Sequence, residues 1–416
     1  MFFFRFALLY HPTMPLRLRF LPGLLLLPGL FRFSAAIYTP IREYSGTDFF
    51  SEWDYYGFID NTTWGNVTYV DQNTGTSQGL TFIDSSTGHA IIRVDNTTNI
   101  PAAQTVNRNS VKITTKDAYP IGSLIIIDVS HIPYGCSVWP SFWMLGTNIL
   151  WPLGGEIDII EAINNLNSNQ YALHTTPGCY LAANSSQTGN TIETDCSTGQ
   201  GCLVQETKPN SFGSGFAQAG GGVFATQLDV SGIYMWFWER SSIPASISQA
   251  DSASTMNLTD WGTPTAAYLS TGCNISQYFQ PQQLVLDITL CGVWAGVPSI
   301  YNSTGCSGQC IDNVIGTGNP IYNDAYWDIA YIRTYLATTT TTDTTGNSSA
   351  SSSSSLAFST SSTPSPSSSG NGNSGSGQNA ANANTAAQTG VWCFPGIPWP
   401  TVPGALLGLV IFTFLW

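Results

Sequence analysis

Charged side chains are scarce in this chain of 416 residues: only 9% of them are Asp, Glu, Lys or Arg, and acidic residues outnumber basic ones by 25 to 12. The formal net charge is −13 at pH 7. So acidic a chain, without any basic cluster, repels nucleic acid, and we exclude nucleic acid as a partner. The sequence also lacks long segments of helical periodicity, internal repeats and a clear cluster of metal ligands. We therefore predict neither a helical architecture nor a cofactor or catalytic metal.

What the chain has instead is a series of short β-forming runs between about residues 37 and 336. Leu124–Val129 and Leu284–Thr289 are two of them, and Gly, Asn, Pro and Ser punctuate the segments between such runs. Many short strands separated by turn residues are typical of a β-sandwich or barrel. A length of roughly 300 residues lies within the range of one all-β domain. The sequence therefore predicts a single all-β domain.

One segment of this domain, Gly-Gly-Glu-Ile-Asp-Ile-Ile-Glu, places three carboxylates within six residues and ends at Glu161. Its apolar residues are those of a buried strand, where carboxylates are costly unless they are hydrated, paired or used. Because side chains alternate along a strand, Glu156 and Asp158 share a face and Glu161 would point to the other. One inserted residue at Ile159-Ile160, forming a β-bulge, would return Glu161 to the same face. Paired carboxyls of this kind perform glycoside hydrolysis; a solvated acidic edge strand is the alternative.

Other motifs surround this segment in a defined order. Trp-Pro-Ser-Phe-Trp (139–143) precedes the acids and Leu-His-Thr (173–175) follows them, while Asp60–Val67 and Cys291–Gly296 lie further out. Together they closely resemble glycoside hydrolase family 16, in particular its fungal laminarinase-like branch, the endo-1,3(4)-β-glucanases. The similarity covers about residues 38–336, which is essentially the whole predicted domain.

The resemblance implies a β-jelly-roll sandwich with a concave substrate cleft. It implies that Glu156 is the nucleophile, Glu161 the general acid/base and Asp158 the carboxylate between them, which we expect to hydrogen-bond to Glu156. The implied substrate is a β-glucan, cleaved by a monomer with retention through a covalent glycosyl-enzyme intermediate. The choice between β-1,3 and mixed β-1,3/1,4 linkages stays open, as does a structural calcium ion of the kind that some relatives carry.

Sugar rings stack on aromatic side chains, and 12% of this chain is aromatic, with 13 Trp. The family places His174 near the cleaved bond, with a satisfied structural histidine as the alternative. Asn164 and Tyr171 are secondary candidates. For the Trp residues of the resembling motifs, ordinary core packing is the alternative, most of all for Trp139. The predicted substrate contacts are Trp151, Trp143, Trp139 and Trp294.

The N-terminal segment and the sequons predict an exported glycoprotein. Residues 1–36 contain four Arg and no acidic residue, and an apolar run from Leu21 to Phe33 precedes Ser34-Ala35-Ala36, as in a secretory signal peptide. Met14 is an alternative start. Eight Asn-X-Ser/Thr sequons indicate N-glycosylation. They are Asn61, Asn66, Asn96, Asn184, Asn257, Asn274, Asn302 and Asn347.

Eight of the nine cysteines lie between Cys136 and Cys310, and an even number in the folded part suits disulfides. The pair Cys306 and Cys310 suits either a short disulfide loop or half of a zinc site. No matching Cys or His pair lies nearby, so we predict the disulfide. Eight cysteines allow 105 connectivities, and the sequence does not choose among them.

The composition changes abruptly after Leu336. Residues 337–390 are almost entirely Thr, Ser, Gly, Asn and Ala, which predicts a disordered, O-glycosylated stalk. Residues 391–416 form an apolar tail without basic residues, interrupted by Pro, which predicts a GPI-attachment signal. A short C-terminal membrane helix is the alternative. We expect an enzyme outside the cell, at its surface or wall, with membrane contact only through this lipid anchor.

Two other functions fit the same pattern. One is a transglycosylase that remodels cell-wall polymers. Family members that join chitin to glucan lack the inserted residue, and Ile159-Ile160 supplies the longer form, which favours the hydrolase. The other is a non-catalytic glucan-binding protein with the same fold. Such relatives lose catalytic acids, whereas this chain keeps all three.

Overall fold

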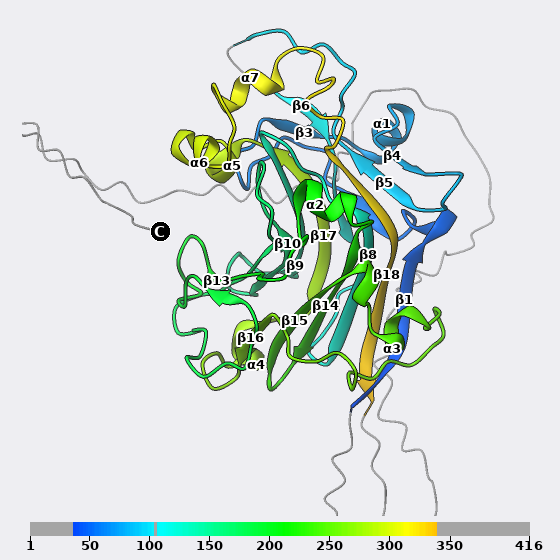
Figure 1. Ribbon diagram of the computed structural model, residues 1–416, viewed down its shortest axis with the longest axis vertical. Helices are drawn as coiled ribbons and strands as arrows, with labels where there is room; N and C mark the ends of the chain where they lie inside the picture. The colour runs from blue at the N-terminus through cyan, green and yellow to red at the C-terminus, as the bar shows by residue number, and fades with distance from the viewer. Residues whose placement is uncertain (1–35, 104–105, 339–416) are drawn as a thin grey trace, which may run out of the picture. The chain divides into compact units, whose positions relative to one another are not determined.

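The computed structural model describes residues 36–103 and 106–338, where two antiparallel β-sheets pack face to face (Figure 1). Almost all of the predicted signal peptide and stalk, and the whole predicted anchor signal, lie outside these residues. The sequon at Asn347 and the ninth cysteine, Cys393, lie outside them as well.

The first sheet has eight strands, and the first and last described strands pair within it from Ile37 opposite Thr338 to Ser45 opposite Tyr331. This pairing brings the two ends of the described domain together. Across the sheet the strands are β16 (Ala266–Leu269), β15 (Gly232–Glu239), β14 (Gly222–Asp229), β8 (Ser123–His131), β18 (Tyr326–Thr338), β5 (Ala90–Arg93) and β4 (Thr81–Ile83), with β1 (Ile37–Ser45) also on β18.

The second sheet also has eight strands and contains the acidic segment near its centre. Across this sheet the strands are β12 (Asn190–Thr191), β13 (Cys202–Gln205), β11 (Gln170–His174), β10 (Glu156–Glu161), β9 (Val138–Gly146), β17 (Gln282–Leu290), β7 (Lys112–Thr115) and β2 (Trp53–Tyr55). A separate parallel pair is formed by β3 (Val67–Tyr69) and β6 (Arg108–Ser110).

Every helix of the described part is short, as the absence of helical periodicity predicts, and none is both long and apolar enough to cross a membrane. The all-β prediction is confirmed. The helices are α1 (Gln72–Ser77), α2 (Gly213–Gln218), α3 (Ala245–Ser248), α4 (Ile275–Tyr278), α5 (Gly292–Ala295), α6 (Pro298–Ser303) and α7 (Cys310–Val314), with 3-10 turns η1 (Gly46–Asp48) and η2 (Arg240–Ser242).

The main hydrophobic core lies between the two sheets. Ile125 and Ile127 of β8 enter it from the first sheet, and Phe142 and Met144 of β9 enter it from the second. Because neighbours on a strand point to opposite faces, Ser141 and Trp143 lie on the outer face of the second sheet. That outer face carries the functional site, and the core behind it is closely packed.

Four disulfides join all eight cysteines of the described domain, as predicted, but the expected short loop between Cys306 and Cys310 is wrong. Cys310 begins α7 and bonds to Cys291 at the end of β17, while Cys306 bonds to Cys136 just before β9. The two cysteines therefore tie one surface segment to two different strands of the second sheet. The remaining pairs are Cys179–Cys273 and Cys196–Cys202.

Candidate active site

The strand β10 carries the three acids, and its register contains the predicted bulge. Against β11, pairing moves from Asp158 opposite Ala172 to Glu161 opposite Gln170, so β10 advances by one residue more than its partner. Against β9 the register also shifts, between Asp158 and Ile160. The extra residue returns Glu161 to the face that Glu156 and Asp158 share. The bulge thus gathers three carboxylates on the outer surface of the sheet.

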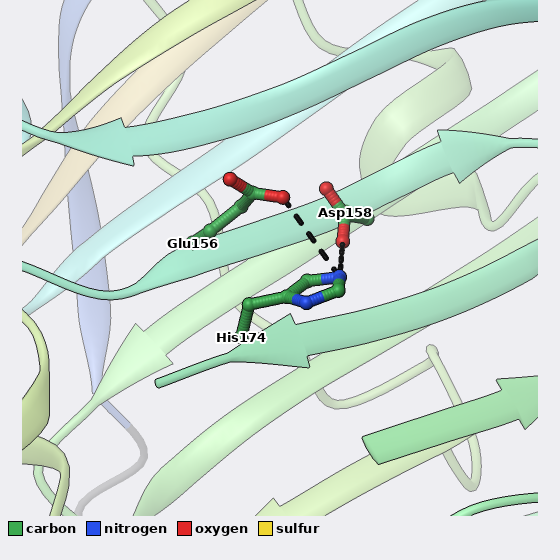
Figure 2. A group of neighbouring side chains, drawn as sticks. All are labelled: Glu156, Asp158 and His174. Carbon is green, nitrogen blue, oxygen red and sulfur yellow. Dashed lines mark ion pairs between the residues drawn. The ribbon is translucent and has the colours of Figure 1, made fainter. Parts of the chain in front are cut away.

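His174 on β11 lies beside two of these carboxylates, directly across the strands from Glu156 (Figure 2). Its Nε2 atom is 3.2 Å from Oδ2 of Asp158 and 3.8 Å from Oε1 of Glu156. We expected Asp158 to hydrogen-bond to Glu156; in the structure both carboxylates contact the same imidazole instead. His174 therefore links Asp158 to Glu156 electrostatically, which agrees with its predicted place near the reacting groups.

Burial and mutual repulsion separate the proton affinities of this cluster. Burial and the charge of Asp158 raise the pKa of Glu161 to about 7. Burial and the charge of Glu156 raise the pKa of Asp158 to about 6, although His174 opposes the rise. Burial favours a neutral His174, but Asp158, Glu156 and Glu161 together outweigh it and raise its pKa to about 9. Near neutral pH the imidazole is protonated, and Glu161 keeps its proton to a higher pH than Asp158 does.

Glu156 lies at the start of β10, where a loop from β9 brings Trp151 over it. Trp151 Nε1 donates a hydrogen bond of 2.7 Å to Oε2 of Glu156. Burial raises the pKa of Glu156, while His174 and the Trp151 hydrogen bond lower it by favouring the ionised form. The Trp151 side chain is 42% exposed, and its ring centroid lies 6.1 Å from that of His174. The preceding Gly155 has φ +74°, and a Cβ there would lie 2.4 Å from Phe279.

Glu161 lies at the other end of β10 and receives two hydrogen bonds from β9. Trp139 Nε1 donates to its Oε1 atom at 2.8 Å, and Ser141 Oγ donates to the same oxygen at 3.1 Å. Trp294 of α5 packs edge-to-face on Trp139, with ring centroids 5.3 Å apart. Trp139 is therefore buried, as core packing predicts, and it is also hydrogen-bonded to one of the acids, as a residue of the site would be. The arrangement orients the Glu161 carboxyl.

Trp143 lies between β10 and β17 on the same face, opposite Asp158 in the register. The Lys112 ammonium is 5.0 Å from the Trp143 ring centroid and 3.8 Å from Oδ2 of Asp287. Burial raises the pKa of Asp287 to about 7, and Lys112 partly offsets the rise. Our reading of the sequence missed this pair. The available signal was a Lys between two apolar β-branched residues, Val111 and Ile113.

The two secondary candidates are buried and structural. Asn164 accepts a hydrogen bond from the backbone N–H of Ser137, and Tyr171 lies in the core, where its hydroxyl donates to Glu206. The sequence analysis also missed Asn169, which is fully buried next to the bulge. No local pattern marks that residue.

Three of these residues also have the donor atoms of a metal site. The ligand atoms of Glu156, Asp158 and His174 all lie within 4.8 Å of one another. Two carboxylates and one imidazole suit a divalent transition metal. His174 already contacts both carboxylates, and glycoside hydrolysis by paired carboxyl groups needs no ion.

The sequence of this chain is similar to those of known proteins. Residues 53–335 match the family model described as the XgeA-like catalytic domain of glycoside hydrolase family 16. A probable glycosidase of Schizosaccharomyces pombe is 36% identical over 310 residues, which span 73% of this chain and 70% of that protein. The endo-1,3(4)-β-glucanase xgeA of Emericella nidulans is 34% identical over 295 residues, 68% of this chain but only 45% of that longer protein.

Two solved structures share the fold at similar identity. Laminarinase 16A from Phanerochaete chrysosporium, solved with 6-O-glucosyl-laminaritriose in its donor and acceptor sites, is 36% identical with a TM-score of 0.68. An elongating family 16 β-1,3-glucosyltransferase is 37% identical with a TM-score of 0.65. Each comparison covers 72% of this chain and 100% of the solved one.

Proposed function

The chain belongs to glycoside hydrolase family 16, and from this premise we propose that it is an endo-1,3(4)-β-glucanase that cleaves β-glucans with retention of configuration. One observation carries the proposal. The bulge in β10 brings Glu161 to the face of Glu156, so that one strand presents both carboxyl groups to one bound sugar. Without the bulge, Glu161 would point into the core.

In the first step, the Glu156 carboxylate attacks the anomeric carbon while the Glu161 carboxyl protonates the departing glycosidic oxygen. The pKa of about 7 keeps a proton on Glu161 in mildly acidic solution, as a general acid requires. The hydrogen bond from Trp151 favours the ionised form of Glu156, as a nucleophile requires. The products are a shortened glucan and a glycosyl ester on Glu156.

In the second step, water attacks the ester while Glu161 removes its proton. The charge of Glu161 raises the pKa of Glu156, and such coupling is reciprocal. Forming the ester removes the charge of Glu156 and so lowers the pKa of Glu161, which prepares it to act as a base. His174 lies beside Asp158 and stays protonated during both steps, so that its positive charge remains near Glu156. Asp158 keeps that imidazole protonated and in place.

Aromatic side chains supply the sugar-binding surface. Trp151 at the Glu156 end of β10 is exposed beside the acid that it contacts. Trp294 and Trp139 form a second aromatic group at the Glu161 end, and Trp143 lies between. A pyranose ring placed over the acids would meet the exposed Trp151 at one end and the half-buried Trp294 at the other, where Trp294 packs on the buried Trp139. The relatives named as β-1,3(4)-glucanases and laminarinase support a β-glucan as the ligand.

We further propose that the enzyme is exported, glycosylated and held at the cell surface by a lipid anchor. Four disulfides in the described domain suit an oxidising compartment. Seven sequons fall on described residues and none of their Asn side chains is buried. The five exposed ones are Asn61, Asn184, Asn257, Asn274 and Asn302.

The test is a product analysis of the full chain on laminarin, with Glu156→Gln as the matched variant. Proton NMR follows the anomeric configuration of the first reducing ends. We expect short oligosaccharides that are released as the β-anomer by the wild type, and a loss of at least about 10³-fold in kcat for Glu156→Gln. Release of the α-anomer would refute retention, and an active Glu156→Gln would refute the nucleophile.

A transglycosylase is the second candidate, favoured by the similarity to the elongating glucosyltransferase. Water and an acceptor sugar compete for the same glycosyl ester, so the two activities share all three acids. In the same experiment, products longer than a supplied laminari-oligosaccharide would identify transfer. Binding of laminarin without any turnover would instead identify a non-catalytic glucan-binding protein.

A further inference from the structure

The bulge in β10 leaves two backbone groups that the strand ladder does not pair in the usual way. They are the backbone carbonyl oxygen of Ile159 and the backbone N–H of Glu161, which lie on either side of the residue between them in the bulge. Both are bonded by one side chain: Asn169 Nδ2 donates to the Ile159 oxygen at 2.9 Å, and Asn169 Oδ1 accepts from the Glu161 N–H at 2.9 Å. The amide of Asn169 thus does for the bulge what a peptide unit of a neighbouring strand does for a regular ladder.

Asn169 is itself held firmly. Its side chain is fully buried. The residue immediately precedes β11, the strand that pairs with β10 at the bulge. Its own N–H donates to Ser211 Oγ at 3.0 Å, and its carbonyl accepts from the backbone N–H of Glu206 at 2.9 Å. Both backbone groups and both polar side-chain atoms of this residue have partners, so its amide plane has little freedom to turn. A rigid amide holds both ends of the bulge in one geometry.

We propose that Asn169 is a positioning residue that sets the direction of the Glu161 carboxyl by closing the bulge. The inference rests on the proposed role of Glu161 as general acid/base. A one-residue slip of a strand moves every later side chain to the opposite face. If the bulge relaxed into regular pairing, Glu161 would leave Trp139 and Ser141 and turn toward the core. Glu156 and Asp158 precede the bulge and keep their places, so loss of Asn169 impairs protonation of the leaving group more than nucleophilic attack.

Only a residue with a donor and an acceptor in one plane fits this place. An Ala leaves two buried backbone groups without partners. A carboxylate from Asp keeps an acceptor for the Glu161 N–H but sets a second oxygen against the Ile159 carbonyl. A protonated Asp carboxyl restores both contacts, since its C=O accepts and its O–H donates. The ionisable residues in contact with this position are Glu161 on β10, Tyr171 on β11 and Glu206 after β13, and the two acidic ones favour the protonated form of an introduced carboxyl.

The experiment compares two substrates with the full-length enzyme. Laminarin needs its leaving oxygen protonated, whereas 2,4-dinitrophenyl β-laminaribioside releases a phenolate that needs little help. For Asn169→Ala we expect kcat/KM to fall about 100-fold on laminarin and less than about fivefold on the dinitrophenyl glycoside, because kcat/KM reports only the steps up to formation of the ester on Glu156, before Glu161 acts as a base. For Asn169→Asp we expect activity on laminarin near the wild-type level at acidic pH and a loss as the introduced carboxyl ionises.

The matched control is Tyr268→Phe. The Tyr268 hydroxyl contacts two backbone carbonyls, of Tyr171 and Cys202, so this variant also disturbs buried hydrogen bonding at β11 but leaves the bulge untouched. We expect it to lower stability without any difference between the substrates. Equal losses on both substrates for Asn169→Ala, after correction for folded enzyme, would overturn the inference, and so would the same substrate difference in Tyr268→Phe. If Asn169→Ala does not fold, Asn169→Asp alone is the test. If the ratio of its laminarin activity to that of the wild type does not change with pH, the inference is overturned.

Glu161→Ala separates this inference from the proposed function. If Glu161→Ala loses kcat/KM on laminarin but keeps kcat/KM on the dinitrophenyl glycoside, the acid assignment stands, and a failure of the Asn169 variants concerns Asn169 only. If Glu161→Ala loses both activities equally, the acid assignment itself fails.

Discussion

Replacing Glu161 by Gln should stabilise the fold at alkaline pH, because the folded protein disfavours the ionised form of the wild-type carboxyl. Its pKa rises from an ordinary 4.5 to about 7 in the folded chain, through burial and the charge of Asp158. Between these pH values the folded protein keeps a proton that the unfolded chain has released. The free energy of unfolding therefore falls as pH rises from 4.5 to about 7, and the loss is complete above that.

The magnitude follows from the two pKa values. At about 1.4 kcal/mol for each pKa unit, the Glu161 carboxyl by itself contributes a loss of roughly 3 kcal/mol of stability across this range. A Gln has no charge to lose, and its amide oxygen can still accept from Trp139 Nε1 and Ser141 Oγ. His174 works in the same direction: its pKa of about 9 gives stability that is complete below pH 6.5 and lost as pH rises through 9. Removing Glu161 also lowers that pKa, which adds to the gain at high pH.

The assay is guanidinium unfolding of wild type and Glu161→Gln at pH 4 and pH 8. We expect the variant to gain roughly 3 kcal/mol relative to the wild type between the two pH values. Ser110→Ala is the control, since it removes a buried hydrogen bond to the Ile288 carbonyl and no charge. Its stability relative to the wild type should be the same at both pH values. A Glu161→Gln difference that does not change with pH would refute the electrostatic account of this site.

Two further predictions follow from single contacts. Trp151→Phe removes the hydrogen bond to Glu156, so the pKa of Glu156 should rise, kcat/KM on laminarin should fall roughly 10- to 100-fold, and the acidic limb of the pH–rate profile should move to higher pH. An unmoved acidic limb would mean that Trp151 acts only by stacking. Replacing Cys136 and Cys306 together by Ser opens a link between residues 170 positions apart and should cost roughly 3–5 kcal/mol in urea unfolding. A change below about 1 kcal/mol would show that the two segments hold together without the bond.

Local sequence was sufficient to predict the acidic strand and its bulge, because both follow from the periodicity of a few neighbouring residues. The alternation of acids and apolar residues in Glu156–Glu161 defines a strand, and the odd spacing of the last acid requires one extra residue. The register shift beyond Asp158 confirms that reasoning. The absence of helical periodicity likewise predicted short helices and an all-β fold. Both inferences depend only on neighbours within a few residues.

Contacts between distant segments depend on the tertiary structure. Cys306 lies four positions from Cys310, yet it bonds to Cys136, because the paths of the strands and not their spacing along the chain set which sulfur atoms meet. The pairing of Lys112 with Asp287 depends on β7 lying next to β17.

The contact of Asn169 with the bulge has the same origin. Asn residues are common before strands, and only the register of β11 against β10 puts this amide opposite the unpaired groups of Ile159 and Glu161. The strand, its bulge, the grouping of the three acids and the use of cysteine for disulfides were predictable, since these follow from local periodicity and composition. The orientation of each acid depends on side chains supplied by neighbouring strands, and strand order is a property of the folded chain alone.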